Sequence, residues 1–355
     1  MGFRDYYRQF AEMAPEEVSA ELRARRDEER RRALLRIDPL DLSGTAWHEP
    51  PHPDAVNAAT FALRRAINAY PDPGAGALRE AVGARHGVPA ERVAVGHGAG
   101  ELLRALLAGG GEVLVAWPGW QPLPALVDGA GGAAVPVAPE PAELLARAGA
   151  GTRAVIVTSP SDPTGARFSR AALRDLRTRL PERTLLVVDE ALGEFAPDGE
   201  DAAGLVAELD GLVVVRSFSK AHAMAGLRIG AALGPPERVA RLPPSGGVSA
   251  PAQAAAAWAL TADGLALAAR RRAAAAAAHR RLAAALAGSP VSAAPAGVPF
   301  AWLSSGVEDG PSLAARLAAA QVYVAPGRLW GDGRHVRAAL RDDAAVDRLA
   351  AALRG

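Results

Sequence analysis

The segment Ser217-Phe218-Ser219-Lys220, followed by Ala225-Gly226-Leu227-Arg228-Ile229-Gly230, contains the only lysine of the 355-residue chain. Arginine supplies every other basic side chain. It matches lysine in charge and salt bridging, but a guanidinium stays protonated and cannot form a Schiff base with an aldehyde. Lys220 is therefore a candidate for covalent chemistry.

Composition limits the class of protein. The length suggests two domains, or one large domain with a smaller one appended. The net charge of +1 gives no basic field for nucleic acid, and the absence of cysteine excludes disulfides and thiolate metal sites. The polar start at residues 1–5 lacks the apolar core of a signal peptide, and the alanine-rich run 251–269 is a weak membrane span. We expect a cytoplasmic protein with small-molecule partners, no nucleic acid and no membrane.

Short apolar runs alternate with helix-like segments between residues 90 and 235. This alternation is typical of an α/β fold with a mostly parallel sheet covered on both faces. Ligands of such sheets bind beyond the carboxyl ends of the strands, where Ser159, Asp189 and Ser217 fall. An alanine-rich helical block follows up to Gly288, and then a smaller α/β unit. The expected strands are 93–95, 112–116, 133–137, 154–158, 185–188 and 212–215, then 300–303, 322–324 and 336–340.

The lysine segment resembles that of the fold type I pyridoxal-phosphate enzymes, within the class I/II aminotransferase family and most like the histidinol-phosphate aminotransferases. The resemblance spans about residues 40–350. It implies that Lys220 forms a Schiff base with the cofactor pyridoxal 5'-phosphate. It also implies that Ser217 and Arg228 hold the cofactor phosphate.

Other family motifs occur upstream in the expected order. Gly98, Ala99 and Gly100 resemble the phosphate loop, where backbone N–H groups at a helix start receive the dianion. Trp120, in Pro118-Gly119-Trp120, matches the aromatic residue that stacks on the pyridine ring. Asp189 matches the aspartate that pairs with the pyridine nitrogen and keeps it protonated, which makes the ring a better electron sink. The resemblance therefore makes Lys220 and Asp189 the expected catalytic residues.

Three further residues follow from the resemblance. Tyr70 matches the tyrosine that reaches the cofactor phosphate of the other subunit, which implies a homodimer. Arg337, in His335-Val336-Arg337-Ala338, matches the arginine that binds a substrate carboxylate by a planar two-point contact, with Arg341 as a second possibility. Trp47 lies in the early segment expected to contact substrate.

Residues 1–40 have no match to the family, but the interleaved acids and arginines at 15–37 predict an N-terminal helical arm. The resemblance implies the organisation of the remaining residues. Residues 41–240 would be the large cofactor-binding domain, with a mostly parallel seven-stranded sheet between helices. Residues 241–355 would form a smaller α/β domain, to which the first residues of the large segment also contribute.

Two departures from the family concern the cofactor's phenolic oxygen. Asp162 replaces the asparagine that donates to this oxygen. An ionised carboxylate has no proton to donate, so Asp162 must be protonated, bridged by water or turned away. Leu192 stands where the family usually has a tyrosine directed at the same atom. Both hydrogen-bond donors are therefore replaced.

The leading hypothesis is an aminotransferase acting on an α-amino acid or related amine. The departures keep open decarboxylation, elimination or replacement on the same scaffold. A cofactor-sensing regulator is a hypothesis from another class, but forty residues before the matched region are too few for a winged-helix module. No metal is expected, because two adjacent prolines in His48-Glu49-Pro50-Pro51-His52 prevent the helix that a zinc-protease motif requires.

Overall fold

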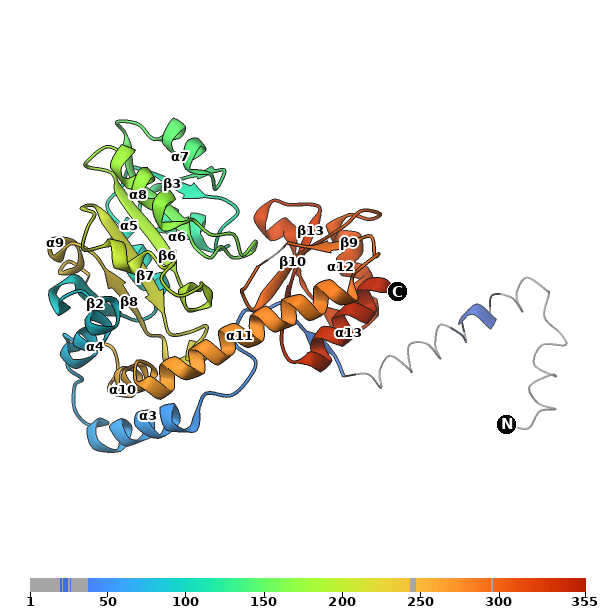
Figure 1. The fold of residues 1–355 in the computed structure, drawn as a ribbon, viewed down its shortest axis with the longest axis horizontal. Helices are drawn as coiled ribbons and strands as arrows, with labels where there is room; N and C mark the ends of the chain where they lie inside the picture. The colour runs from blue at the N-terminus through green and yellow to red at the C-terminus, as the bar shows by residue number, and fades with distance from the viewer. Residues whose placement is uncertain (1–19, 21, 25, 27–37, 243–246, 295) are drawn as a thin grey trace.

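The computed structural model describes residues 20, 22–24, 26, 38–242, 247–294 and 296–355. The expected N-terminal arm at 1–40 lies almost entirely outside these residues. Two α/β units are visible in Figure 1, and the long helix α11 (Ala262–Ala285) runs from the larger one to the smaller one.

A seven-stranded sheet forms the larger unit. Its strand order is β2-β8-β7-β6-β5-β3-β4, and only β8 runs antiparallel to its neighbours. The mostly parallel α/β sheet expected from the sequence is therefore confirmed. The strands are β2 (Val93–Gly96), β3 (Glu112–Ala116), β4 (Ala133–Val137), β5 (Thr152–Thr158), β6 (Leu185–Glu190), β7 (Leu212–Ser217) and β8 (Gly230–Leu233).

Consecutive strand residues alternate between two apolar cores because side chains along a strand point to opposite faces. Along β6, Leu186 and Val188 belong to one core, whereas Leu185 and Val187 belong to the other. Burying each such side chain contributes about 1.5–3 kcal/mol. A sheet that is apolar on both faces must be covered by helices on both sides.

The helices are divided between these two faces. Residues of α3, α4, α7, α8 and α10 contribute to one core, and residues of α5, α6 and α9 contribute to the other. Their bounds are α3 (Pro53–Ala66), α4 (Gly76–His86), α5 (Ala99–Leu107), α6 (Leu123–Gly129), α7 (Pro141–Arg147), α8 (Arg170–Arg179), α9 (Pro236–Val239) and α10 (Ala250–Ala259).

The smaller unit has a four-stranded sheet in the order β12-β13-β10-β9. Its apolar face packs against α11, α12 and α13, and the buried Leu42 joins this core from the N-terminal side. The elements are β9 (Val291–Ala293), β10 (Phe300–Ser305), β12 (Ala325–Pro326), β13 (His335–Ala339), α12 (Gly310–Ala319) and α13 (Asp343–Arg354).

The structure adds detail to several sequence expectations. The strand expected at 322–324 is β11 (Val322–Tyr323), which pairs in parallel with β1 (Leu40–Asp41) and not with the four-stranded sheet. The helical block expected after residue 245 consists of two helices, and Thr261 caps the start of α11 by accepting a hydrogen bond from the Gly264 amide. Helix α10 packs into the core of the large sheet. Among the described residues, no helix has both the length and the apolar character needed to cross a membrane.

Candidate active site

A cavity of about 170 Å³ lies at the carboxyl ends of the parallel strands. It brings together residues from segments that are far apart in sequence. The predicted site residues that line it are Ala99, Gly100, Trp120, Asp162, Asp189, Ser217, Lys220 and Arg228, and Leu192 lines it as well.

The central strands position three of the lining side chains. Thr158 ends β5, Asp189 is next to last in β6, and Ser217 ends β7. The pairing of Thr158 with Asp189 puts the ends of β5 and β6 side by side. Asp189 is buried, and its Oδ1 accepts a hydrogen bond of 2.9 Å from the Ala191 amide. Burial raises the pKa of Asp189 to about 6, although this hydrogen bond and the charge of Lys220 oppose the shift.

Lys220 projects its amine into the same cavity. Its Nζ donates to Thr45 Oγ1 at 2.5 Å, a contact that joins residues 175 positions apart. Burial lowers the pKa of Lys220, whereas the charges of Asp162 and Asp189 raise it. Because only the unprotonated amine is a nucleophile, the lowered pKa favours attack on a carbonyl.

Arg228 lines the cavity and approaches Gly98, which directly precedes the lining residues Ala99 and Gly100, so this region is a candidate anion site. Gly98 caps the N-terminus of α5 with a φ of 91°, and no side chain caps this helix. A Cβ on Gly98 would lie 2.7 Å from Arg228 Nη2, so glycine is required for the guanidinium to approach the helix start. Free N–H groups and the helix dipole both favour an anion there.

These features fit a flat, phosphorylated pyridine. Ala99, Gly100, Ser217 and Arg228, the residues predicted to bind phosphate, line the cavity together with Asp189. The Trp120 ring also lines the cavity and lies close to Gly100. A Cβ added to Gly100 would be 3.3 Å from Trp120 Cη2. Thr158 Oγ1 is buried in the lining and has no hydrogen-bond partner among the described residues. A bound polar group would satisfy this hydroxyl.

Arg337 lies outside the residues that line the cavity, behind Asp162. Its Nη1 donates to Asp162 Oδ1 at 2.5 Å, and both side chains are buried. The Asp162 carboxylate, which also borders the cavity, is therefore paired with a cation through Oδ1.

Gly98, Tyr70 and Trp47 are the other predicted residues that do not line the cavity. Tyr70 is 98% exposed. Trp47 packs against Phe195, and its Nε1 donates to Glu49 Oε2 at 2.9 Å.

Sequence reasoning missed several residues of this site. Thr45 belongs to a loop with no distinctive motif, so nothing in the sequence indicated its contact with Lys220. Thr158 was recognised as a strand residue, and its position at the end of that strand could have identified it. Ser219 lines the cavity and its amide donates to Ser217 Oγ at 3.1 Å. Ser159 was expected at the ligand edge, but its Oγ instead accepts from the Phe168 amide at 3.0 Å.

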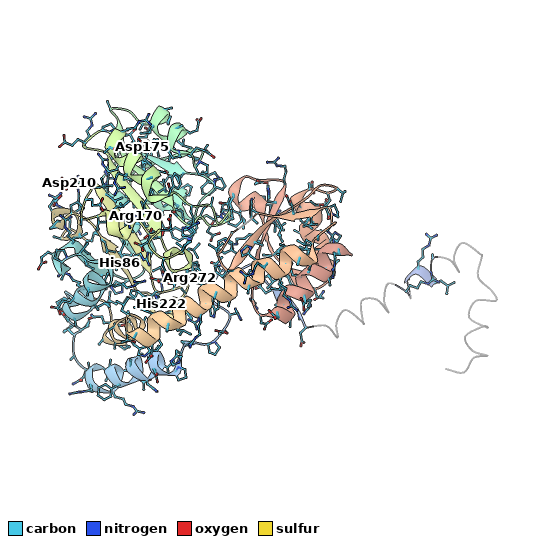
Figure 2. All side chains as sticks on the ribbon, in the orientation of Figure 1. His86, Arg170, Asp175, Asp210, His222 and Arg272 are labelled. Carbon is cyan, nitrogen blue, oxygen red and sulfur yellow. The ribbon has the colours of Figure 1, made fainter. Side chains whose placement is uncertain are left out.

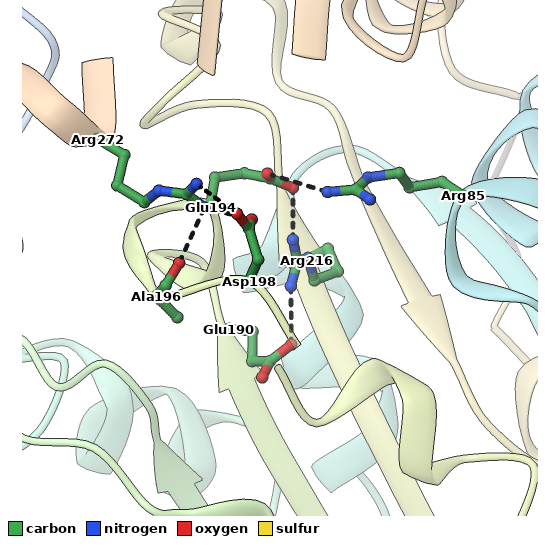
Figure 3. Close-up of polar contacts among 7 residues, drawn as sticks. All are labelled: Arg85, Glu190, Glu194, Ala196, Asp198, Arg216 and Arg272. Carbon is green, nitrogen blue, oxygen red and sulfur yellow. Dashed lines mark hydrogen bonds and ion pairs between the residues drawn. The ribbon is translucent and has the colours of Figure 1, made fainter. Parts of the chain in front are cut away.

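A buried ion-pair network lies beside the site and holds two strand ends together. Arg216 of β7 donates to Glu190 of β6 at 2.9 Å and to Glu194 at 2.5 Å (Figure 3). Burial alone would raise the pKa of Glu194, but Arg216 outweighs it and lowers that pKa to about 2. Glu190 and Arg216 are also directly paired across the two strands. The network therefore fixes the residues next to Asp189 and Ser217.

Two histidines lie close to this network. His86 and His222 are labelled in Figure 2, and the charges of Arg216 and Glu194 act on both. Burial lowers the pKa of His222 to about 4, so it is neutral near pH 7. His222 faces this network and does not line the cavity that contains Lys220.

Comparison with known proteins identifies related sequences. The family model for aminotransferase class I and II matches residues 40–353. An aromatic amino acid aminotransferase of Corynebacterium jeikeium is 37% identical over 223 residues, which are 59% of this chain and 59% of that protein. A histidinol-phosphate aminotransferase of Rubrobacter xylanophilus is 41% identical over 192 residues, which are 51% of this chain and 54% of that protein. The chain thus spans little more than half the length of the curated relatives it matches.

Solved structures match over more of the chain. Aspartate aminotransferase from Thermus thermophilus with maleate has a TM-score of 0.79 at 26% identity, and the match covers 99% of this chain and 100% of that one. Histidinol-phosphate aminotransferase from Sinorhizobium meliloti, in complex with pyridoxal-5'-phosphate, has a TM-score of 0.76 at 26% identity and covers 92% of each chain. With the family model matching most of its length, the chain belongs to the aminotransferase class I and II family.

Proposed function

We propose that this protein is a pyridoxal 5'-phosphate-dependent aminotransferase that acts on an α-amino acid or related amine. The observation that carries the proposal is the placement of the only lysine, Lys220, in one cavity with Asp189 and the candidate anion site at Arg228. The related aminotransferases and the cofactor in the S. meliloti structure support the same proposal.

The bound cofactor supplies an electron sink for the electron pair released at the substrate carbon. Lys220 Nζ would hold the cofactor covalently and would carry the proton at the substrate Cα. The carboxylate of Asp189 would hold the proton on the pyridine nitrogen. Arg228, Ser217 and the first amides of α5 would bind the phosphate, and Trp120 would orient the ring.

Borohydride reduction tests the covalent role of Lys220. Reduction of the cofactor-loaded protein should leave a stable adduct on the peptide that contains Lys220, detected by mass spectrometry. A Lys220→Arg variant retains the charge but cannot form the adduct. An unlabelled Lys220 peptide in folded, cofactor-saturated protein would refute the proposal. Detection of keto acid, aldehyde, carbon dioxide or ammonia from each amine then separates transamination from decarboxylation and elimination.

We also propose that the active unit is a homodimer. Phe61 and Ile67, on and just after α3, are 62% and 76% exposed, and Tyr70 follows at 98% exposure. An exposed apolar surface of this kind is typical of an interaction site. It lies near a hollow lined by Val56 of α3 and by Met224, which follows Lys220 closely in sequence.

Mixed dimers test this arrangement. If Tyr70 serves the neighbouring subunit, co-expressing a Tyr70→Phe chain with a Lys220→Ala chain should produce hybrids that have one intact site. Activity should then exceed that of either variant alone. A monomer in sedimentation velocity, or no complementation, would contradict the proposal.

A further inference from the structure

The pair formed by Asp162 and Arg337 changes the charge that a substrate meets. Arg337 Nη1 donates to Asp162 Oδ1 at 2.5 Å, and Arg337 Nη2 donates to the Ser43 carbonyl oxygen at 2.6 Å. The two terminal nitrogens of the guanidinium are therefore both engaged by the protein. A two-point contact with a substrate carboxylate needs two N–H groups on one edge.

Two aromatic rings also pack near the Arg337 guanidinium. The Trp330 ring lies 4.9 Å from its central carbon, and the Phe300 ring lies 5.6 Å from it. The remaining nitrogen, Nε, is buried and has no partner among the described residues. A ligand could reach this nitrogen only if the surrounding side chains moved.

Asp162, in contrast, borders the cavity. A carboxylate approaching Arg337 from the cavity would first meet the carboxylate of Asp162, and like charges repel. The ion pair also neutralises Arg337, so this end of the site carries no net positive charge. The family asparagine at the position of Asp162 is uncharged, so it would not neutralise Arg337.

We propose that the site takes a primary amine whose reacting carbon bears no carboxylate. Arg337 would otherwise bind a substrate carboxylate, but it is already paired with Asp162. This inference rests on the proposed aminotransferase function. The half-reaction converts R–CH₂–NH₂ and the aldehyde form of the cofactor into R–CHO and the amine form of the cofactor. The substrate loses two electrons and its amino group, the cofactor gains both, and the water released on condensation is consumed on hydrolysis.

Carboxylate affinity provides the first test. Propionate is the probe, because it is a small carboxylate without an amino-acid side chain that the site could recognise. Ligand-observed NMR titration of the cofactor-loaded protein should show weak binding to the wild type. Asp162→Asn should bind propionate at least tenfold more tightly, because asparagine can still accept from Arg337 but no longer neutralises it. Propionamide, which is uncharged, should bind both proteins equally.

The double variant Asp162→Asn/Arg337→Met assigns the gain to Arg337. It should return propionate affinity to the wild-type value. Equal propionate affinity for the wild type and Asp162→Asn would overturn the inference. So would a gain that survives the loss of Arg337. The Lys220 adduct is measured in the same preparations. If the adduct is absent, the aminotransferase proposal is refuted. If it is present but propionate affinity is unchanged in Asp162→Asn, only the proposed substrate class is refuted.

Matched substrate pairs test the wild type without any substitution. Alanine is compared with ethylamine, phenylalanine with 2-phenylethylamine, and histidine with histamine, each pair sharing a side chain and differing in the carboxylate. Conversion of the cofactor to its amine form is followed by single-turnover absorbance. For pairs that react, the second-order rate constant should be at least tenfold higher for the amine, and a higher rate constant for the amino acid would overturn the inference.

Discussion

Replacing Arg216 by methionine should destabilise the fold strongly. The Arg216 side chain is 9% exposed and its partner Glu190 only 3% exposed. Without the guanidinium, Glu190 retains one hydrogen bond, 2.5 Å long, from the Ala202 amide. Removing one partner of a buried ion pair leaves an uncompensated charge, which costs about 3–5 kcal/mol. Urea unfolding followed by tryptophan fluorescence should show a loss of this size.

The pH dependence of this loss identifies its cause. Burial raises the pKa of Glu190, and Arg216 opposes that shift. In Arg216→Met the pKa of Glu190 rises further above its unfolded value. A raised carboxyl pKa makes the folded state less stable as pH increases past the unfolded pKa. The deficit should therefore be larger at pH 8 than at pH 5, and Arg216→Met/Glu190→Gln should recover much of it.

Arg174→Met is the matched control. Arg174 contacts Glu208 at 2.5 Å, as short as the Arg216–Glu194 contact, but these side chains are 46% and 48% exposed. Exposed pairs contribute about 0–1 kcal/mol. A loss below about 1 kcal/mol in Arg216→Met, or equal losses in the two variants, would refute the argument that burial decides the cost.

Three further predictions concern the cofactor site and the contact between the two units. Gly98→Ala should weaken pyridoxal 5'-phosphate binding at least tenfold in a fluorescence titration, because a side chain at this positive φ is strained and meets Arg228. Gly129→Ala is the control: a Cβ there has open space, so this variant should bind the cofactor normally. Affinity of the cofactor-free protein for pyridoxal 5'-phosphate should decrease as pH falls below about 6, where Asp189 becomes protonated, and Asp189→Asn should abolish this dependence. Trp330→Phe removes the 2.9 Å bond from Nε1 to the Gly119 carbonyl oxygen and should cost about 1 kcal/mol in urea unfolding if aromatic packing is kept.

Local sequence patterns predicted the parts of this fold that depend on local chemistry. Apolar runs bounded by polar residues located β3 and β4 at their observed bounds, and placed Asp189 and Ser217 at strand ends. The antiparallel strand β8 was missed, since its four residues, Gly-Ala-Ala-Leu, show no strong strand pattern. Pairing partners along the sheet depend on tertiary packing, which a local pattern does not encode.

Contacts between distant segments were the part of the site that could not be predicted. Lys220 with Thr45, and Arg337 with Asp162, each join residues 175 positions apart. The sequence showed that Asp162 could not donate a proton in its ionised form, but left three solutions open. Only the folded geometry, which brings β13 behind the Asp162 turn, shows that this carboxylate pairs with Arg337.

The pleat of the sheet places the cavity residues and the buried ion pair on opposite faces of the same strands. Asp189 and Glu190 are adjacent in β6, and Arg216 and Ser217 are adjacent in β7, so within each pair the side chains point to opposite faces. Asp189 and Ser217 line the cavity, whereas Glu190 and Arg216 form the ion pair on the other face. Burial raises the pKa of Asp189, so its ionised form depends on a correctly placed cationic partner. The position of Asp189 must therefore be fixed. The ion pair provides that support without touching any ligand, so substitutions in it should alter cofactor affinity through position and leave the chemistry of the cavity residues unchanged.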